Sequence, residues 1–125
     1  MTVDRRRAER DRRTAGRVTA VFAVKSVVRG RVQLGQAEDI GAGGLSLRRP
    51  REMVLRPGTP VTLTFALPGT GALYRLRAVV VTDVMIEGFR RTGLRFLSLA
   101  STEAQSIEDF CRGRAWVAGD AACVA

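Results

Sequence analysis

The sequence contains no histidine and only two cysteines among its 125 residues. Without histidine, the Ser-His-Asp and Cys-His nucleophile systems are excluded, and the usual general base and most zinc sites are lost as well. Cys111 and Cys123 stand 12 positions apart, which matches neither a CxxC redox pair nor a zinc knuckle. We interpret both as free thiols in a reducing compartment. We therefore expect no metal, no cofactor and no enzymatic activity.

Long apolar runs are also missing from the sequence. No stretch approaches the ~18 residues that a membrane-spanning helix needs. The N-terminus begins with a basic cluster, Arg5-Arg6-Arg7, and Lys25 interrupts the first apolar run. Neither feature suits a secretory signal peptide. These absences predict a cytoplasmic protein that does not insert into a membrane.

Positive charge is in excess: 21 basic and 12 acidic side chains give a formal net charge of +9. Seven arginines lie within residues 1–17, where no apolar periodicity is present. We therefore expect residues 1–16 to form a flexible arginine-rich arm. The chain is 46% apolar, which suffices for the core of one ordinary domain. We assign that domain to residues 17–114 and a C-terminal tail to residues 115–125.

Apolar and polar residues alternate with a period of two through most of this domain. Such alternation is typical of half-buried β-strands. It is clearest over residues 18–24, 61–67, 74–80 and 94–96, and weaker over residues 32–39 and 45–47. Turn signals rich in glycine and proline separate these segments. The pattern predicts a mainly β fold, a small antiparallel barrel of six strands.

The period changes near the C-terminus and predicts one α-helix. Thr102 and Gln105 fit a capping box at its start, and Gly113 stands where a helix would end. One apolar stripe follows the helical spacing: Ala104, Ile107, Phe110 and Cys111. We expect this helix to cover the barrel.

Arginines are concentrated immediately before the first predicted strand. Arg12, Arg13 and Arg17 each carry a rigid fork of donors that suits a phosphate or the O6/N7 edge of guanine. Arg13 and Arg17 are close enough in sequence to converge on one anion. The alternative interpretation is a solvated basic leader that only keeps the protein soluble.

A glycine-rich turn lies between two of the predicted strands. Asp39 is followed by Gly41, Gly43 and Gly44, so the backbone is free to approach a ligand closely. The carboxylate of Asp39 could then accept hydrogen bonds from N1 and N2 of a guanine. Alternatively, Asp39 caps a tight hairpin turn and the glycines only supply backbone freedom.

The order of these features resembles the PilZ domain family. An RRxxxR arm leads into the first strand, and an Asp-x-x-x-x-Gly turn follows about twenty residues later. Gly93-Leu94-Arg95-Phe96 before the helix is similar to the family's Gly-(Ile/Leu)-x-Phe strand, and the resemblance runs from Arg12 to Arg114. It implies a six-stranded PilZ-type barrel with a C-terminal helix that binds the bacterial second messenger cyclic di-GMP.

Carried over onto this sequence, the resemblance implies ligand contacts from both motifs. The arginines of the family's RxxxR motif fall on Arg13 and Arg17, and Arg12 precedes them. The aspartate and the closing glycine of the family's second motif fall on Asp39 and Gly44. Gly41 occupies the position of the family's serine, which is a departure. One lost neutral hydrogen bond corresponds to about a three- to tenfold loss of affinity, which weakens binding without abolishing it.

Three functions remain open from the sequence. The first is a cyclic di-GMP receptor that signals through contacts with an unidentified bacterial effector protein. The second is a degenerate PilZ adaptor that binds its protein partner without ligand. The third, nonspecific nucleic-acid binding, is the least favoured of the three, because the few aromatic residues fall on predicted core faces and leave no stacking platform.

No arrangement of carboxylates suggests catalysis. Asp83 and Glu87 flank a predicted turn, so we interpret both as solvated turn carboxylates. Arg90 and Arg91 follow on the next strand; they could extend the basic face toward the ligand, but we favour a salt link to Glu87.

Overall fold

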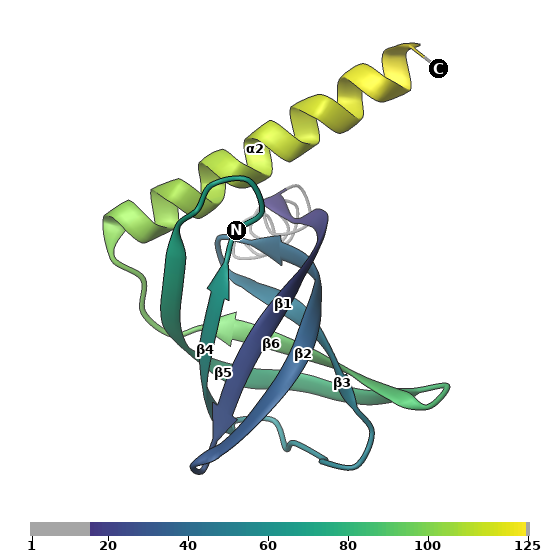
Figure 1. Ribbon diagram of the computed structural model, residues 1–125, viewed down its shortest axis with the longest axis vertical. Coiled ribbons are helices and arrows are strands. Elements are labelled where there is room, and N and C mark those ends of the chain that lie inside the picture. The colour runs from purple at the N-terminus through teal and green to yellow at the C-terminus, as the bar shows by residue number, and fades with distance from the viewer. Residues whose placement is uncertain (1–15, 125) are drawn as a thin grey trace, which may run out of the picture.

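The computed structural model describes residues 16–124. Within that range the chain forms six strands followed by one helix. These elements are β1 (Val18–Val28), β2 (Arg31–Gly41), β3 (Gly44–Pro50), β4 (Pro60–Ala66), β5 (Leu73–Ile86), β6 (Phe89–Phe96) and α2 (Ser101–Val124). Figure 1 shows the strands wrapping around a barrel, with α2 lying across one end and running on beyond it. The predicted mainly β fold is confirmed.

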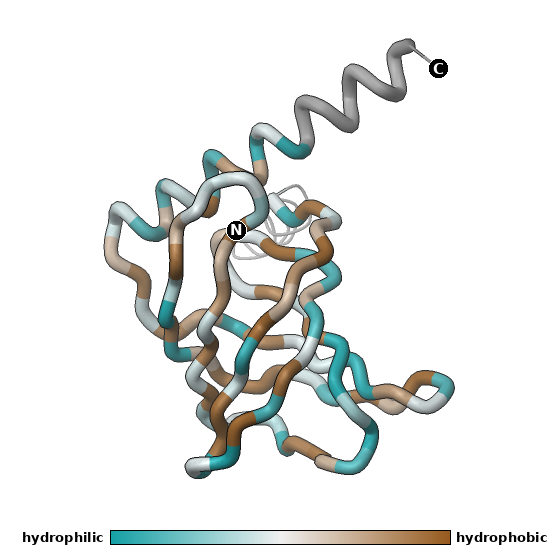
Figure 2. Tube along the Cα trace, viewed as in Figure 1, coloured by the Kyte–Doolittle hydropathy of each residue, from teal (hydrophilic) through white to brown (hydrophobic). Residues whose placement is uncertain are grey.

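All neighbouring strands are antiparallel, and in the described chain the barrel closes in the order β1-β2-β3-β6-β5-β4. Closure removes the free sheet edges that would otherwise invite pairing with other chains. The predicted alternation is confirmed, because the inward residues of β1, β4 and the first half of β5 are buried and the residues between them are half-buried or exposed. Figure 2 shows the resulting change between hydrophobic and hydrophilic residues along the strands. Phe65 lies at the centre of the core, 5.5 Å from the rings of Phe22 and Tyr74.

A β-bulge in β5 reverses which residues face the core. Val80 pairs with Leu94, but Thr82 rather than Val81 pairs with Gly93, so one extra residue is inserted. The extra residue reverses the parity of the strand, so Asp83, which would have faced solvent, points inward. Asp83 is therefore buried, with its side chain only 2% exposed, and its interpretation as a solvated turn carboxylate is wrong.

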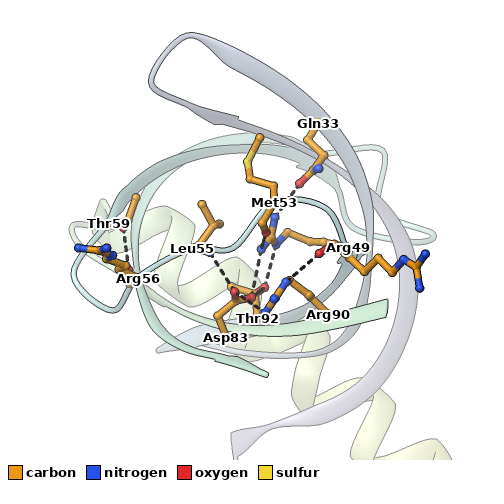
Figure 3. Close-up of polar contacts among 10 residues, drawn as sticks. Gln33, Arg49, Met53, Leu55, Arg56, Thr59, Asp83, Arg90 and Thr92 are labelled. Atoms are coloured by element: carbon orange, nitrogen blue, oxygen red, sulfur yellow. Dashed lines mark hydrogen bonds and ion pairs between the residues drawn. The ribbon is translucent and has the colours of Figure 1, made fainter. Parts of the chain in front are cut away.

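Asp83 belongs to a buried polar network at the barrel end away from α2 (Figure 3). Its Oδ1 accepts hydrogen bonds from Thr92 at 2.7 Å and from Arg49 at 3.1 Å, and its Oδ2 accepts one from the Leu55 backbone at 2.9 Å. Burial alone would raise the pKa of Asp83, but these hydrogen bonds and the charge of Arg49 outweigh it, so the pKa lies below its ordinary value.

The arginines of β6 pair with other carboxylates than expected. Arg90 contacts Asp83 at 3.2 Å, and Arg91 contacts Glu38 at 3.3 Å. Glu87 instead lies in the β5–β6 turn, where its own φ is 45°. The predicted salt link of Arg90 and Arg91 to Glu87 is therefore wrong, because the bulge turned a nearer carboxylate toward Arg90.

Helix α2 differs from its prediction at both ends. The carboxylate of Glu103, rather than a Thr102 and Gln105 pair, caps the first turn by accepting the Ala100 N–H at 3.0 Å. The helix also continues through Gly113 to Val124, because alanines follow this glycine and alanine has the highest helix propensity. Within residues 16–124, no helix is both long and apolar enough to span a membrane.

Candidate functional site

The fold brings Arg17 and Asp39 together although 22 positions separate them. One guanidinium nitrogen, Nη1 of Arg17, lies 3.2 Å from Oδ1 of Asp39 and 3.4 Å from Oγ of Ser46. The pair is open to solvent, with the two charged side chains 40% and 34% exposed. Residues from both sequence motifs therefore meet at one place on the surface. Arg12 and Arg13 lie outside the described residues.

Irregular strand pairing determines where Asp39 lies. Ala37 pairs with Leu47 and Asp39 with Ser46, which leaves Glu38 as the extra residue of a bulge in β2. On its other side Asp39 pairs with Thr19, two positions after Arg17. Asp39 is thus set between the start of β1 and the middle of β3. Sequence reasoning missed Ser46, which carries no motif signal and joins the site only through strand register.

Gly41 and Gly44 have different roles in this geometry. A Cβ atom at Gly41 would lie 2.9 Å from Cγ of Arg17 and 3.2 Å from the carbonyl oxygen of Gly16. The Arg17 side chain therefore occupies the space that the family's serine would need. A Cβ atom at Gly44 would overlap the carbonyl oxygen of Leu94 in β6, so this glycine is required for close packing of β3 against β6.

A cavity of about 900 Å³ opens beside the glycine turn. Its volume is within the range of about 300–1,000 Å³ that is usual for small-molecule sites. The predicted residues Arg17 and Gly41 line it, together with Ser46. Its remaining lining residues are Gly16, Ala42, Gly43, Val81, Thr82, Gly93, Leu94, Arg95, Phe96, Glu108, Cys111 and Arg112. The cavity thus extends from the motif turn to β6 and α2, which the sequence motifs did not indicate.

Cys111 closes the cavity on the side of α2. It is a free, buried thiol whose Sγ donates to the backbone oxygen of Ile40 at 3.3 Å. Burial raises the pKa of Cys111, and the nearby charge of Glu108 raises it further. The thiol is therefore protonated at neutral pH and acts as a packing contact between α2 and β2. The free-thiol prediction is confirmed for Cys111, while Cys123 lies outside the described side chains.

Comparison with solved structures identifies similar folds. The chain superimposes on MotI/DgrA, the inhibitor of motility of Bacillus subtilis, with a TM-score of 0.72 and 20% identity over 80% of this chain. The PilZ domain of YcgR from Escherichia coli, solved with c-di-GMP, gives a TM-score of 0.67 and 14% identity, with coverage of 85% of this chain and 93% of that one.

A third similar structure is the c-di-GMP complex of MrkH from K. pneumonia, with a TM-score of 0.71 and 18% identity over 83% of this chain. This chain spans only 49% of the MotI/DgrA chain and 52% of the MrkH chain. No curated protein sequence matches it.

The sequence itself matches a family profile. The profile described as PilZ domain covers residues 4–113, which is most of the chain. That range includes both motifs, all six strands and the first half of α2 within the described residues. The chain belongs to the PilZ domain family.

Proposed function

We propose that this protein is a cyclic di-GMP receptor whose ligand binds at the cavity beside Arg17 and Asp39. The observation that carries the proposal is the meeting of these two residues next to a glycine-rich turn and a cavity of suitable volume. Structural neighbours solved with c-di-GMP support it. Arg17, with Arg12 and Arg13 from the preceding arm, would bind phosphate and the Hoogsteen edge of guanine, and Asp39 would accept from its N1 and N2.

The ion pair between Arg17 and Asp39 does not oppose this function. Ligand binding has to open the pair, because each group then needs its charge for the dinucleotide. A solvent-exposed ion pair contributes only about 0–1 kcal/mol, so opening it costs less than about fivefold in affinity. Charge-assisted hydrogen bonds to phosphate contribute roughly 1.5–3 kcal/mol each, which more than offsets that cost.

Output is proposed to pass through protein contacts. When the ligand fastens residues 1–16 against the barrel beside Asp39, the surface offered to another protein changes. The partner would be a bacterial effector protein in the cytoplasm, and the chain would act as an adaptor with residues 17–114 as its binding domain. The protein would then need no catalytic group of its own.

Calorimetric titration of the purified protein with cyclic di-GMP tests the proposal. We expect binding that Arg17→Ala and Asp39→Ala each weaken by at least tenfold. Arg31→Ala is the matched control, since it removes one exposed arginine at the start of β2, at the barrel end away from α2.

Absence of heat with folded wild-type protein at tens of micromolar ligand in low salt would reject a receptor. The ligand-independent adaptor would then be favoured. A gel shift with unrelated DNA that persists at about 0.2 M salt would instead support nonspecific nucleic-acid binding.

A further inference from the structure

The cavity beside Arg17 has a second wall of charged residues that belongs to neither motif. Arg95 of β6 lines it, as do Glu108 and Arg112 of α2. Together with Arg17 these make three guanidinium groups and one carboxylate around one cavity. The formal charge of the lining is therefore positive, which suits a ligand with two phosphates.

Arg95 is held in position by the tightest backbone approach in the site. It pairs with Gly44 across the β3–β6 ladder, and Leu94 beside it is in the close contact that requires Gly44 to be a glycine. Leu94 and Phe96 point into the core, so Arg95 points outward into the cavity. Among residues 16–114, whose side chains the structure describes, no carboxylate forms an ion pair with Arg95.

Arg112 reaches the cavity because α2 is anchored immediately before it. Ile107 is fully buried against the barrel, and Cys111 is bonded to the Ile40 carbonyl. Among the side chains that the structure describes, Arg112 forms an ion pair with Asp109 alone, at 3.4 Å, and the two side chains are 72% and 58% exposed. Such a pair is worth little, so the guanidinium is available to a stronger anion.

We infer that Arg95 and Arg112 form a second phosphate-binding wall, so that the ligand bridges the barrel and helix α2. This inference rests on the proposed function and adds that ligand binding is coupled to the stability of α2. The barrel holds α2 mainly through Ile107 and Cys111. A dianion contacting Arg17, Arg95 and Arg112 together would add a link between barrel and helix. Ligand occupancy would therefore stabilise α2 against local opening.

Calorimetric titration with cyclic di-GMP of Arg95→Gln and Arg112→Gln variants tests the second wall. Each substitution is expected to weaken binding by about tenfold, because each removes one charge-assisted contact. Arg31→Gln is the matched control, and its affinity should stay within about twofold of wild type at moderate salt. The dependence of affinity on salt should also become less steep in Arg95→Gln and Arg112→Gln.

Hydrogen exchange of the α2 amides provides a readout of the coupling. Saturating ligand should slow exchange in α2 of the wild type, and much less in Arg112→Gln at equal saturation. If the wild-type protein binds cyclic di-GMP and the affinities of Arg95→Gln and Arg112→Gln equal that of Arg31→Gln, the second wall is wrong and the receptor function stands. If affinity falls but α2 protection is unchanged, the bridge to the helix is wrong. If folded wild-type protein binds no ligand, both proposals fail.

Discussion

At the scale of single residues, Gly41 decides how the two motifs interact. The missing side chain leaves room for Cγ of Arg17, and the guanidinium beyond it reaches Asp39 and Ser46. A serine here would add a hydroxyl near the nucleotide and would also move Arg17. Under the proposed function the hydroxyl would add a hydrogen bond and Asp39 would lose its competing partner, provided that the Arg17 guanidinium still reaches the ligand.

We therefore predict that Gly41→Ser tightens cyclic di-GMP binding by about three- to tenfold, the effect of one neutral hydrogen bond. The substitution should lower the free energy of unfolding by about 1–3 kcal/mol, because the added Cβ atom would lie 2.9 Å from Cγ of Arg17 and 3.2 Å from the Gly16 carbonyl oxygen, so the chain at residues 16 and 17 has to shift. Calorimetry measures the affinity, and denaturant unfolding measures the stability.

Gly43→Ser is the matched control for this substitution. It places the same side chain on the same turn, but its Cβ atom would have nothing within 4 Å. Its affinity should stay near wild type. If Gly41→Ser binds more weakly than wild type, the placement of Arg17 over this glycine is itself part of the ligand site.

At the scale of secondary-structure elements, regular alternation was predictable and interruptions were not. The inward faces of β1 and β4 follow directly from period-two patterns around Phe22 and Phe65. The bulges at Glu38 and Val81 have no such signal, because they depend on pairing with a distant strand. This is why the burial of Asp83 was not predicted.

The candidate site was predictable to a similar degree. Arg17, Asp39 and Gly41 were found because sequence motifs contain them, and the structure does bring them together. Arg95 and Arg112 were not found, since their places in the cavity wall depend on the β6 register and on where α2 crosses the barrel. A site built from several elements cannot be read from local patterns alone.

Glycine positions allow a prediction for the middle of α2. A Cβ atom would meet nothing within 4 Å at either Gly113 or Gly30, but Gly30 has a φ of 77°. Gly113→Ala should favour the helix by about 0.5–1 kcal/mol, whereas Gly30→Ala should destabilise the β1–β2 turn by about 1–2 kcal/mol.

Circular dichroism and hydrogen exchange around residue 113 measure the first effect, and denaturant unfolding measures the second. If Gly113→Ala and Gly30→Ala changed the free energy of unfolding by the same amount and in the same direction, backbone conformation would not be what distinguishes these two glycines.

At the scale of the whole molecule, the two ends of the barrel have different tasks. One end carries α2 and the cavity that Arg17, Arg95 and Arg112 line, where we propose that the ligand binds. The other end holds the network in which Arg49 donates to Thr92, Gln33, Met53 and Asp83 (Figure 3). There the side chains of Arg49 and Asp83 are only 1% and 2% exposed. This network ties the segment between β3 and β4 to the barrel wall through Met53 and Leu55, so we expect the stability of the fold to depend on it.

Stability at acidic pH should therefore depend on Asp83. The pKa of Asp83 in the folded protein is below its ordinary value of 3.8, so the native state binds its proton less readily than the unfolded chain does. The contribution of Asp83 to the free energy of unfolding is complete above the pKa that Asp83 has in the unfolded chain. It is lost as the pH falls through the lower pKa that Asp83 has in the folded protein. Asp83→Asn should cost about 3–5 kcal/mol near pH 7, because the buried Arg49 loses its charged partner.

Because the amide introduced by Asp83→Asn cannot titrate, the difference in unfolding free energy between wild type and this variant should narrow as the pH falls below about 4. Denaturant unfolding of both proteins from about pH 7 to about pH 3 measures that difference. The other carboxylates titrate in both proteins, so their contributions largely cancel in the difference. Asp109→Asn, at an exposed pair, is the control and should change stability by less than about 0.5 kcal/mol throughout. A difference for Asp83→Asn that stays constant down to about pH 3 would mean that the network holds a carboxyl group whose charge contributes nothing to folding.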